Sequence, residues 1–191
     1  MRRKDREILN FEEQVRIVSR CTQAMIGMVD QGKAYVVPID FGYKVHDGHL
    51  SLYAHSAPEG RKMDILRKNP DITVTLSHSF RIGLGNTPQM WTNAFESVMG
   101  DAHVVFLEDF KDRLESIQLL MDRYHMGPIP ESVYPTIKYM ACYRIDITSM
   151  TGKSNLTQKQ RDTWGRLETL QKTINDPRTT LQTIRNELDA L

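Results

Sequence analysis

Tight turns between strand-like segments are the feature that most constrains this chain. Gln31-Gly32 and Asp47-Gly48 are dipeptides typical of the sharp turns that join β-hairpins. β-rich or alternating segments flank both turns and predict strands at Ala24–Asp30, Ala34–Val45 and His49–His55. Strands joined by such short turns run antiparallel, because a parallel pair needs a long crossover connection.

Similar patterns continue toward the C-terminus. Further strands are predicted at Asp71–His78, Trp91–Met99, Asp101–Phe106 and Tyr139–Ile147. Apolar residues at helical spacing predict helices at about 10–22, about 60–68 and Phe110–Tyr124, and loops rich in glycine or proline cover Phe80–Gln89 and Met126–Pro135. Six or so strands, with helices inserted between some of them, predict a mainly β fold in which an antiparallel sheet closes into a small barrel.

Pro38 restricts the place of its strand in the sheet. Proline has no N–H to donate to a strand ladder, so within Ala34–Val45 it indicates an edge strand, a bulge or a bend. Gly42 repeats that signal four residues later.

Composition bounds the class of protein. The 191 residues fit one domain with an appendage, and 25 Lys+Arg against 24 Asp+Glu leave no net field to attract nucleic acid or a membrane surface. Cys21 and Cys142 form no disulfide or metal pattern, and no apolar stretch has the length of a signal-peptide core or a membrane span. We expect a cytoplasmic protein with no nucleic-acid or membrane partner. The polar segment 154–191 predicts two further helices, separated at Asp176-Pro177.

The stretch Leu50–Asn69 carries the most suggestive chemistry. A strand-like run becomes helix-like within it, and Ser56, Arg61 and Lys62 lie at the change. A helix start offers unpaired N–H groups and a partial positive charge, so two added cations make a pocket suited to phosphate. Alternatively, Ser56 and Glu59 have the spacing of a capping box, and exposed cations are common on any first helical turn. The residues alone leave both interpretations open.

The histidines form no metal-binding pattern. His49 and His55 share one strand face without an evident third ligand, and the other histidines are scattered, so no metal site is expected. A lone histidine at a strand end, such as His55, is more often a hydrogen-bonded structural residue. Its imidazole could also transfer a proton, because that group titrates near neutral pH.

Longer blocks carry a resemblance to a known family. They are MRRKDREI at the N-terminus, VVPIDFGY at 36–43 and LYAHSAPEGRKMDILRKNP at 52–70, followed by Glu96-Ser97-Val98-x-Gly100 and Thr151-Gly152-Lys153. In this order and spacing they closely resemble the 5-nitroimidazole-resistance family, within the pyridoxamine-5′-phosphate-oxidase-like, flavin-binding split barrels. The resemblance covers roughly residues 1–153. It departs from the family at Gln89-Met90-Trp91, where a cysteine is common, and in the loop at 80–90.

The resemblance implies a six-stranded antiparallel split β-barrel of the FMN-binding type over residues 1–153, with a helical C-terminal extension over 154–191. It implies a homodimer with FMN or FAD at each subunit interface. The residues implied to hold the flavin phosphate are Ser56, Gly60, Arg61 and Lys62, with a further contact from Ser97. The segment implied to line the isoalloxazine is Pro38, Ile39, Asp40, Phe41, Gly42 and Tyr43. His55 matches a histidine with an implied direct role at the reacting centre.

The leading hypothesis is therefore a flavin-dependent oxidoreductase that reduces nitro-heterocycles or other small aromatic acceptors, with His55 as proton donor. A non-enzymatic flavin- or haem-binding module would use the same binding residues, although haem would need an axial ligand that the sequence does not identify. A pyridoxamine-phosphate oxidase proper is a third interpretation, for which we find no dedicated pyridoxal-phosphate motif. Kinship of fold alone does not establish that activity.

Overall fold

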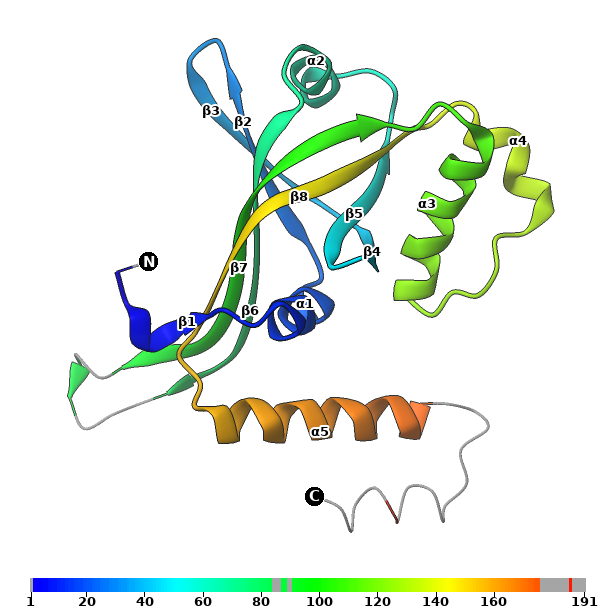
Figure 1. Cartoon of the computed structure of the whole chain (residues 1–191). Coiled ribbons are helices and arrows are strands. Elements are labelled where there is room, and N and C mark those ends of the chain that lie inside the picture. The colour runs from blue at the N-terminus through cyan, green and yellow to red at the C-terminus, as the bar shows by residue number, and fades with distance from the viewer. Residues whose placement is uncertain (1, 84–86, 89–90, 176–185, 187–191) are drawn as a thin grey trace. The chain divides into compact units, whose positions relative to one another are not determined.

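The computed structural model describes residues 2–83, 87–88, 91–175 and 186. Internal contacts divide the chain into two compact units, Met1–Ser154 and Asn155–Leu191. The first unit is a strongly curved sheet with helices set against it (Figure 1). In the second unit, the described helix is α5 (Gln158–Asn175), and the further helix expected after Asp176-Pro177 lies outside the described residues.

The first unit is built mainly from strands. They are β1 (Glu7–Ile8), β2 (Ala24–Asp30), β3 (Lys33–Ile39), β4 (Gly42–His46), β5 (His49–Ser56), β6 (Asp71–Gly83), β7 (Thr92–Phe106) and β8 (Ala141–Ser154). Its α-helices are α1 (Phe11–Arg20), α2 (Arg61–Lys68), α3 (Phe110–Arg123) and α4 (Tyr134–Ile137). Short 3₁₀ turns are η1 (Lys4–Arg6) and η3 (Glu131–Val133).

All described strands belong to one sheet of eight, and every pair is antiparallel, which confirms the predicted mainly β class. The order is β3-β2-β6-β7-β8-β5-β4, with β1 paired to β8. The strands at the two ends of this path, β3 and β4, are consecutive in the chain and separated by Asp40 and Phe41 alone. The sheet therefore has to curve until its two edges approach each other at this corner.

The number of strands differs from the six or so that were expected. The expected strand Ala34–Val45 is two strands, because the chain changes direction at Asp40–Phe41. The two strands expected on either side of Gly100 form one strand, β7. Gly100 lies inside β7, where the backbone of β8 passes close to it. A Cβ at Gly100 would overlap the carbonyl oxygen of Ser149. β1 has only two residues, which are too few to give a strand pattern in the sequence.

Several local predictions are confirmed. Gln31 and Gly32 have φ of 50° and 78°, as a tight hairpin turn between β2 and β3 requires. Pro38 lies in β3, which is an edge strand. The Asn10 side chain accepts a hydrogen bond from the N–H of Glu13 at 2.9 Å and so begins α1.

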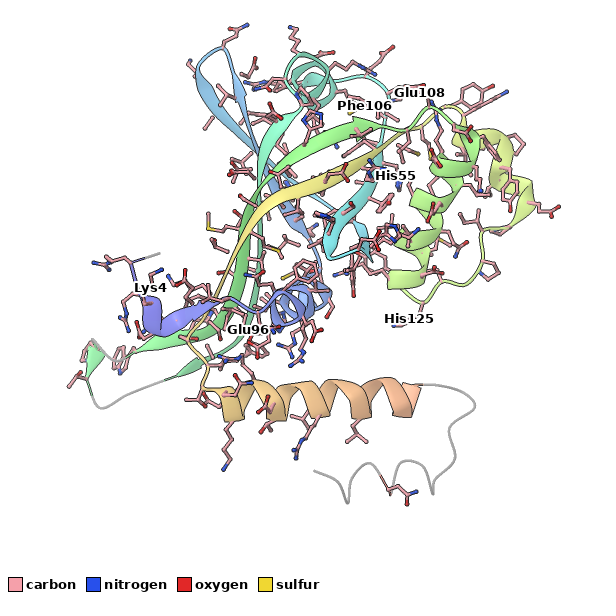
Figure 2. All side chains as sticks on the ribbon, viewed as in Figure 1. Lys4, His55, Glu96, Phe106, Glu108 and His125 are labelled. Carbon is pink, nitrogen blue, oxygen red and sulfur yellow. The ribbon has the colours of Figure 1, made fainter. Side chains whose placement is uncertain are left out.

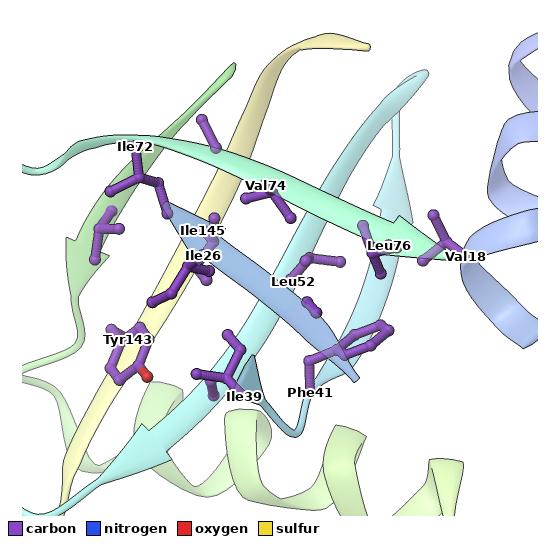
Figure 3. Close-up of a cluster of buried hydrophobic side chains, with 14 of the residues drawn as sticks. Val18, Ile26, Ile39, Phe41, Leu52, Ile72, Val74, Leu76, Tyr143 and Ile145 are labelled. Atoms are coloured by element: carbon purple, nitrogen blue, oxygen red, sulfur yellow. The ribbon is translucent and has the colours of Figure 1, made fainter. Parts of the chain in front are cut away.

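The core lies on the concave face of the sheet. Figure 3 shows Phe41, Tyr143 and their neighbours converging there from several strands. α1 and α2 add buried side chains to the same cluster, which include Val18 and Leu66. α3 lies on the opposite face, where its residues pack around a second cluster of Tyr53, Leu107 and Cys142. Among the described residues, no helix combines the length and apolar character needed to cross a bilayer.

Candidate functional site

The site is built where β5 ends and α2 begins. Side chains alternate along β5, so Ala54 lies in the core on the concave face, while Tyr53 lies in the cluster under α3. The same alternation puts Ser56 on the concave side and exposed His55 on the convex side. Figure 2 labels His55 near β5. The side chains of His55 and Ser56 therefore lie on different faces of the sheet.

The start of α2 is not capped by a side chain. Gly60 is the N-cap residue, with a φ of 119°, and no side-chain hydrogen bond is made to the first turn. The Ser56 hydroxyl instead lies 3.1 Å from both the Ala57 carbonyl oxygen and the Met63 sulfur. The capping-box alternative is therefore wrong, and the first N–H groups of α2 keep their partial positive charge available.

Lys62 extends from the first turn of α2 toward β8. Its ammonium donates a hydrogen bond to the hydroxyl of Tyr143 at 3.1 Å, and lies 5.5 Å from the centre of that ring. Burial lowers the pKa of Lys62, and no carboxylate of the described residues opposes that effect. A partly desolvated cation without an acidic partner favours a nearby anion.

Arg61 takes a different direction, because consecutive residues of a helix point about 100° apart. Its guanidinium forms an ion pair with Asp30 at 2.8 Å and lies 4.3 Å from the centre of the Tyr35 ring. Both partners belong to the β2–β3 hairpin. The structure thus separates the two cations that the sequence puts side by side.

Two charged groups at this end of the sheet, Lys62 and Asp40, affect the pKa of His55. Burial by surrounding atoms is the main cause that lowers its pKa, the charge of Lys62 lowers it further, and the Asp40 carboxylate opposes both. An exposed imidazole that is desolvated in this way is mainly neutral at pH 7, because its pKa lies below the usual value of 6.5.

The segment from Pro38 to Tyr43 turns the corner between β3 and β4. Pro38 and Asp40 are exposed, Tyr43 is half-buried, and Ile39, Phe41 and Gly42 are buried. The Arg123 guanidinium of α3 lies 4.2 Å from the centre of the Phe41 ring and 5.5 Å from that of Tyr43. A Cβ at Gly42 would lie 2.5 Å from the backbone of Leu119. Packing of α3 therefore accounts for this glycine without a ligand.

A comparison with models of known protein families shows the family to which this chain belongs. A family model described as pyridoxamine 5′-phosphate oxidase matches residues 12–154. The chain belongs to the pyridoxamine 5′-phosphate oxidase family. A comparison with curated proteins gave no match.

Solved structures add detail to this family membership. A protein from Bacteroides thetaiotaomicron described as a 5-nitroimidazole antibiotic resistance protein is 28% identical, covers 77% of this chain and 85% of its own, and superposes with a TM-score of 0.66. It supports the resemblance found in the sequence. A flavocytochrome from Azotobacter vinelandii shares the fold at 19% identity, with a TM-score of 0.67 over 82% of this chain and 72% of its own. A FAD-binding protein from Mesorhizobium loti does so at 22% identity, with a TM-score of 0.55 over 78% and 96%.

Ser97, a predicted flavin contact, lies far from the predicted phosphate contacts of this family member. It pairs with Lys153 in the ladder between β7 and β8, whereas Tyr143 pairs with Phe106 at the other end of β7. Phe106 is nine positions along the strand from Ser97, which corresponds to about 30 Å of chain. Within one chain, Ser97 and Lys62 therefore belong to different regions.

Two residues of this region were missed by the sequence interpretation. Tyr143 was seen only as part of a strand, although strand alternation could have placed it in the core beside Ile145. Arg123 was seen only as part of a helix, yet it donates hydrogen bonds to the carbonyls of Val18, Ser19 and Cys21 and thereby satisfies the C-terminal end of α1. Nothing local in the sequence indicates that contact.

Proposed function

We propose that this family member binds a flavin nucleotide, FMN or FAD, through a phosphate at the start of α2. The observation that carries the proposal is the Lys62 ammonium, which is half-buried, has no carboxylate partner among the described residues, and projects from an uncapped helix start. A phosphate at this position would compensate the desolvated cation and accept hydrogen bonds from the free N–H groups.

The residues present fit such a group. Ser56 offers a hydroxyl on the same side of the sheet as the Tyr143 phenol that Lys62 contacts. Gly60 has no side chain to cover the first turn of α2. Arg61 would join the phosphate site by giving up its exposed ion pair with Asp30, which has a small free-energy cost.

We further propose that the chain works as a homodimer. Met25, Val29, Val36 and Met99 expose 40%, 60%, 58% and 50% of their surface, and all lie on the convex face of neighbouring strands. Ser97 lies next to Met99 on that side of β7. An exposed apolar face of this kind favours association. A second copy bound to this face would also contribute its Ser97 to the proposed flavin site, from which Ser97 of the same subunit is distant.

For chemistry, we propose reduction of a nitro-heterocycle or another small aromatic acceptor. A bound flavin would supply the electron transfer. Reduction of a nitro group consumes protons, and His55 is an exposed imidazole at the end of β5 that could deliver one. Because Lys62 is one cause of its lowered pKa, a bound phosphate anion would raise the pKa of His55 and increase its protonated fraction. The 28% identical resistance protein supports this choice of acceptor.

A non-enzymatic flavin- or haem-binding module is the second candidate. A protein from Mycobacterium smegmatis that shares the fold at 13% identity is described as binding FAD and haem. In the described part of this chain, no cluster of three or more His, Cys, Asp or Glu side chains is arranged to hold a metal ion. Steady turnover of a nitro-heterocycle with NAD(P)H, lost in His55→Ala, would support the enzyme, whereas flavin binding without turnover would support the module.

Purification and spectroscopy test the proposed cofactor directly. We expect the protein to show a flavin absorption spectrum as isolated or after addition of FMN or FAD, and mass spectrometry to identify the nucleotide. Lys62→Ala should weaken binding about tenfold or more, since a charge-assisted hydrogen bond is removed. Lys68→Ala, at the exposed end of the same helix, should bind like the wild type. A protein that takes up neither flavin would refute the proposal.

A further inference from the structure

Tyr143 connects the core of the sheet to the start of α2. It pairs with Ala54 of β5 on one side and Phe106 of β7 on the other, and its side chain is fully buried. Its hydroxyl nevertheless reaches the Lys62 ammonium at 3.1 Å. The phenol is thus fixed by the sheet, whereas the lysine stem has several rotatable bonds.

The protonation state of Tyr143 suits this contact. Burial raises its pKa to about 12, so the phenol keeps its proton at physiological pH. Its oxygen accepts a hydrogen bond from the Lys62 ammonium. This hydrogen bond joins a side chain of α2 to a side chain of β8.

The hydroxyl has no role in packing that a phenylalanine could not fill. Its neighbours in the core cluster, such as Ile145 and Val104, are apolar. A buried hydroxyl destabilises a core unless it is hydrogen-bonded, and here its partner is the Lys62 ammonium of the proposed phosphate site. The position of this polar group is best explained by what it does to Lys62.

We propose that Tyr143 is a positioning residue whose hydroxyl holds the Lys62 ammonium at the start of α2, where it receives the phosphate of the bound nucleotide. This inference rests on the proposed function and assigns a determinant of affinity to a residue outside the predicted site. It implies that Tyr143 acts on phosphate-bearing flavins alone, because the contact it controls is made to the phosphate.

Binding of FMN and of riboflavin, which has no phosphate, separates this role from a structural one. In the full chain, Tyr143→Phe should raise the Kd for FMN about tenfold and leave that for riboflavin within about twofold of the wild-type value. Tyr53→Phe is the matched control, since Tyr53 is a buried tyrosine on the face of the sheet opposite to Tyr143. It should bind both flavins like the wild type. Equal weakening of FMN and riboflavin by Tyr143→Phe would overturn the inference.

A double-mutant cycle tests whether Tyr143 acts through Lys62. In a Lys62→Met background, removal of the Tyr143 hydroxyl should cause no further loss of FMN affinity. The pH profile gives an independent readout, because a hydrogen bond to the ammonium favours its charged form. FMN affinity falls as pH rises through the pKa of Lys62, and Tyr143→Phe should move this fall to lower pH.

The possible failures are distinguishable. A wild-type protein that binds neither flavin overturns the proposed function and this inference with it. FMN binding that depends on Lys62 but is unchanged by Tyr143→Phe overturns the inference alone. Additive losses in the double-mutant cycle would likewise contradict positioning through Lys62, even if Tyr143→Phe binds FMN weakly.

Discussion

Replacement of Gly42 by alanine should loosen α3 from the sheet. The new Cβ would lie 2.5 Å from the carbonyl carbon of Leu119, 2.7 Å from the nitrogen of Leu120 and 2.8 Å from the Cβ of Leu119. Ordinary contact begins at 3.4 Å, so the helix backbone would have to move by about 1 Å. Overpacking of this kind costs about 1–3 kcal/mol.

Thermal unfolding followed by circular dichroism measures the effect. At about 2–4 °C per kcal/mol for a domain of this size, the expected loss in Tm is about 2–12 °C. Gly27→Ala is a matched control, because its new Cβ would meet nothing closer than 3.6 Å and β2 should accept it with little change. A Gly42→Ala variant that melts with the wild type but binds FMN poorly would refute this reasoning, since the glycine would then serve a ligand.

Three further substitutions test the buried ion pair, the pKa of His55 and the exposed apolar face. Glu96→Gln replaces the fully buried carboxylate that lies 2.5 Å from the Arg20 guanidinium by a neutral amide, and should lower the free energy of unfolding by about 3–5 kcal/mol in denaturant titrations. The pKa of His55, measured by NMR, should lie below 6.5, and Lys62→Met should raise it, although burial remains the larger cause of the shift. Met99→Lys adds a charge to the exposed apolar face and should shift the protein from dimer to monomer in sedimentation experiments.

Exposed substitutions provide the controls. Lys44→Met breaks an ion pair with Glu115 whose side chains are 47% and 43% exposed, and should change stability by less than about 1 kcal/mol. A loss as large as that of the buried pair would contradict the importance of burial. Lys68→Met should leave the His55 titration unchanged, and Asp112→Lys on α3 should leave the dimer intact. If either control behaves like its test variant, the effect comes from net charge rather than position.

The features that the sequence predicts well depend on neighbouring residues. Turn dipeptides, strand alternation and the Asn10 cap are local, and the structure has each of them where the pattern indicates. Pro38 and Gly42 indicated an edge strand, a bulge or a bend, and β3 is an edge strand that ends in a corner at Asp40–Phe41. The sequence could not choose among these alternatives, because the choice depends on where β3 and β4 lie in the whole sheet.

Contacts across the fold account for what the sequence could not predict in the site. Lys62 and Tyr143 are 81 positions apart, and their hydrogen bond exists because the fold brings the first turn of α2 to the start of β8. Arg61 was expected beside Lys62 at a phosphate, but its partner Asp30 comes from a distant hairpin. Its role at a phosphate stays a prediction, as do those of Ser97 and His55. No local pattern reports which distant side chain a cation meets.

The position of β8 in the sheet determines when the chain can fold. β8 is the last strand of the described chain and lies between β5 and β7, so the β4–β5 hairpin joins the sheet only through it. During synthesis, hairpins such as β2–β3 can form early, but the facing edges of β5 and β7 stay unpaired until Ala141–Ser154 has emerged. Unpaired edges invite association with other chains. The nascent protein is therefore most exposed to aggregation just before β8, the last of the described strands, is made.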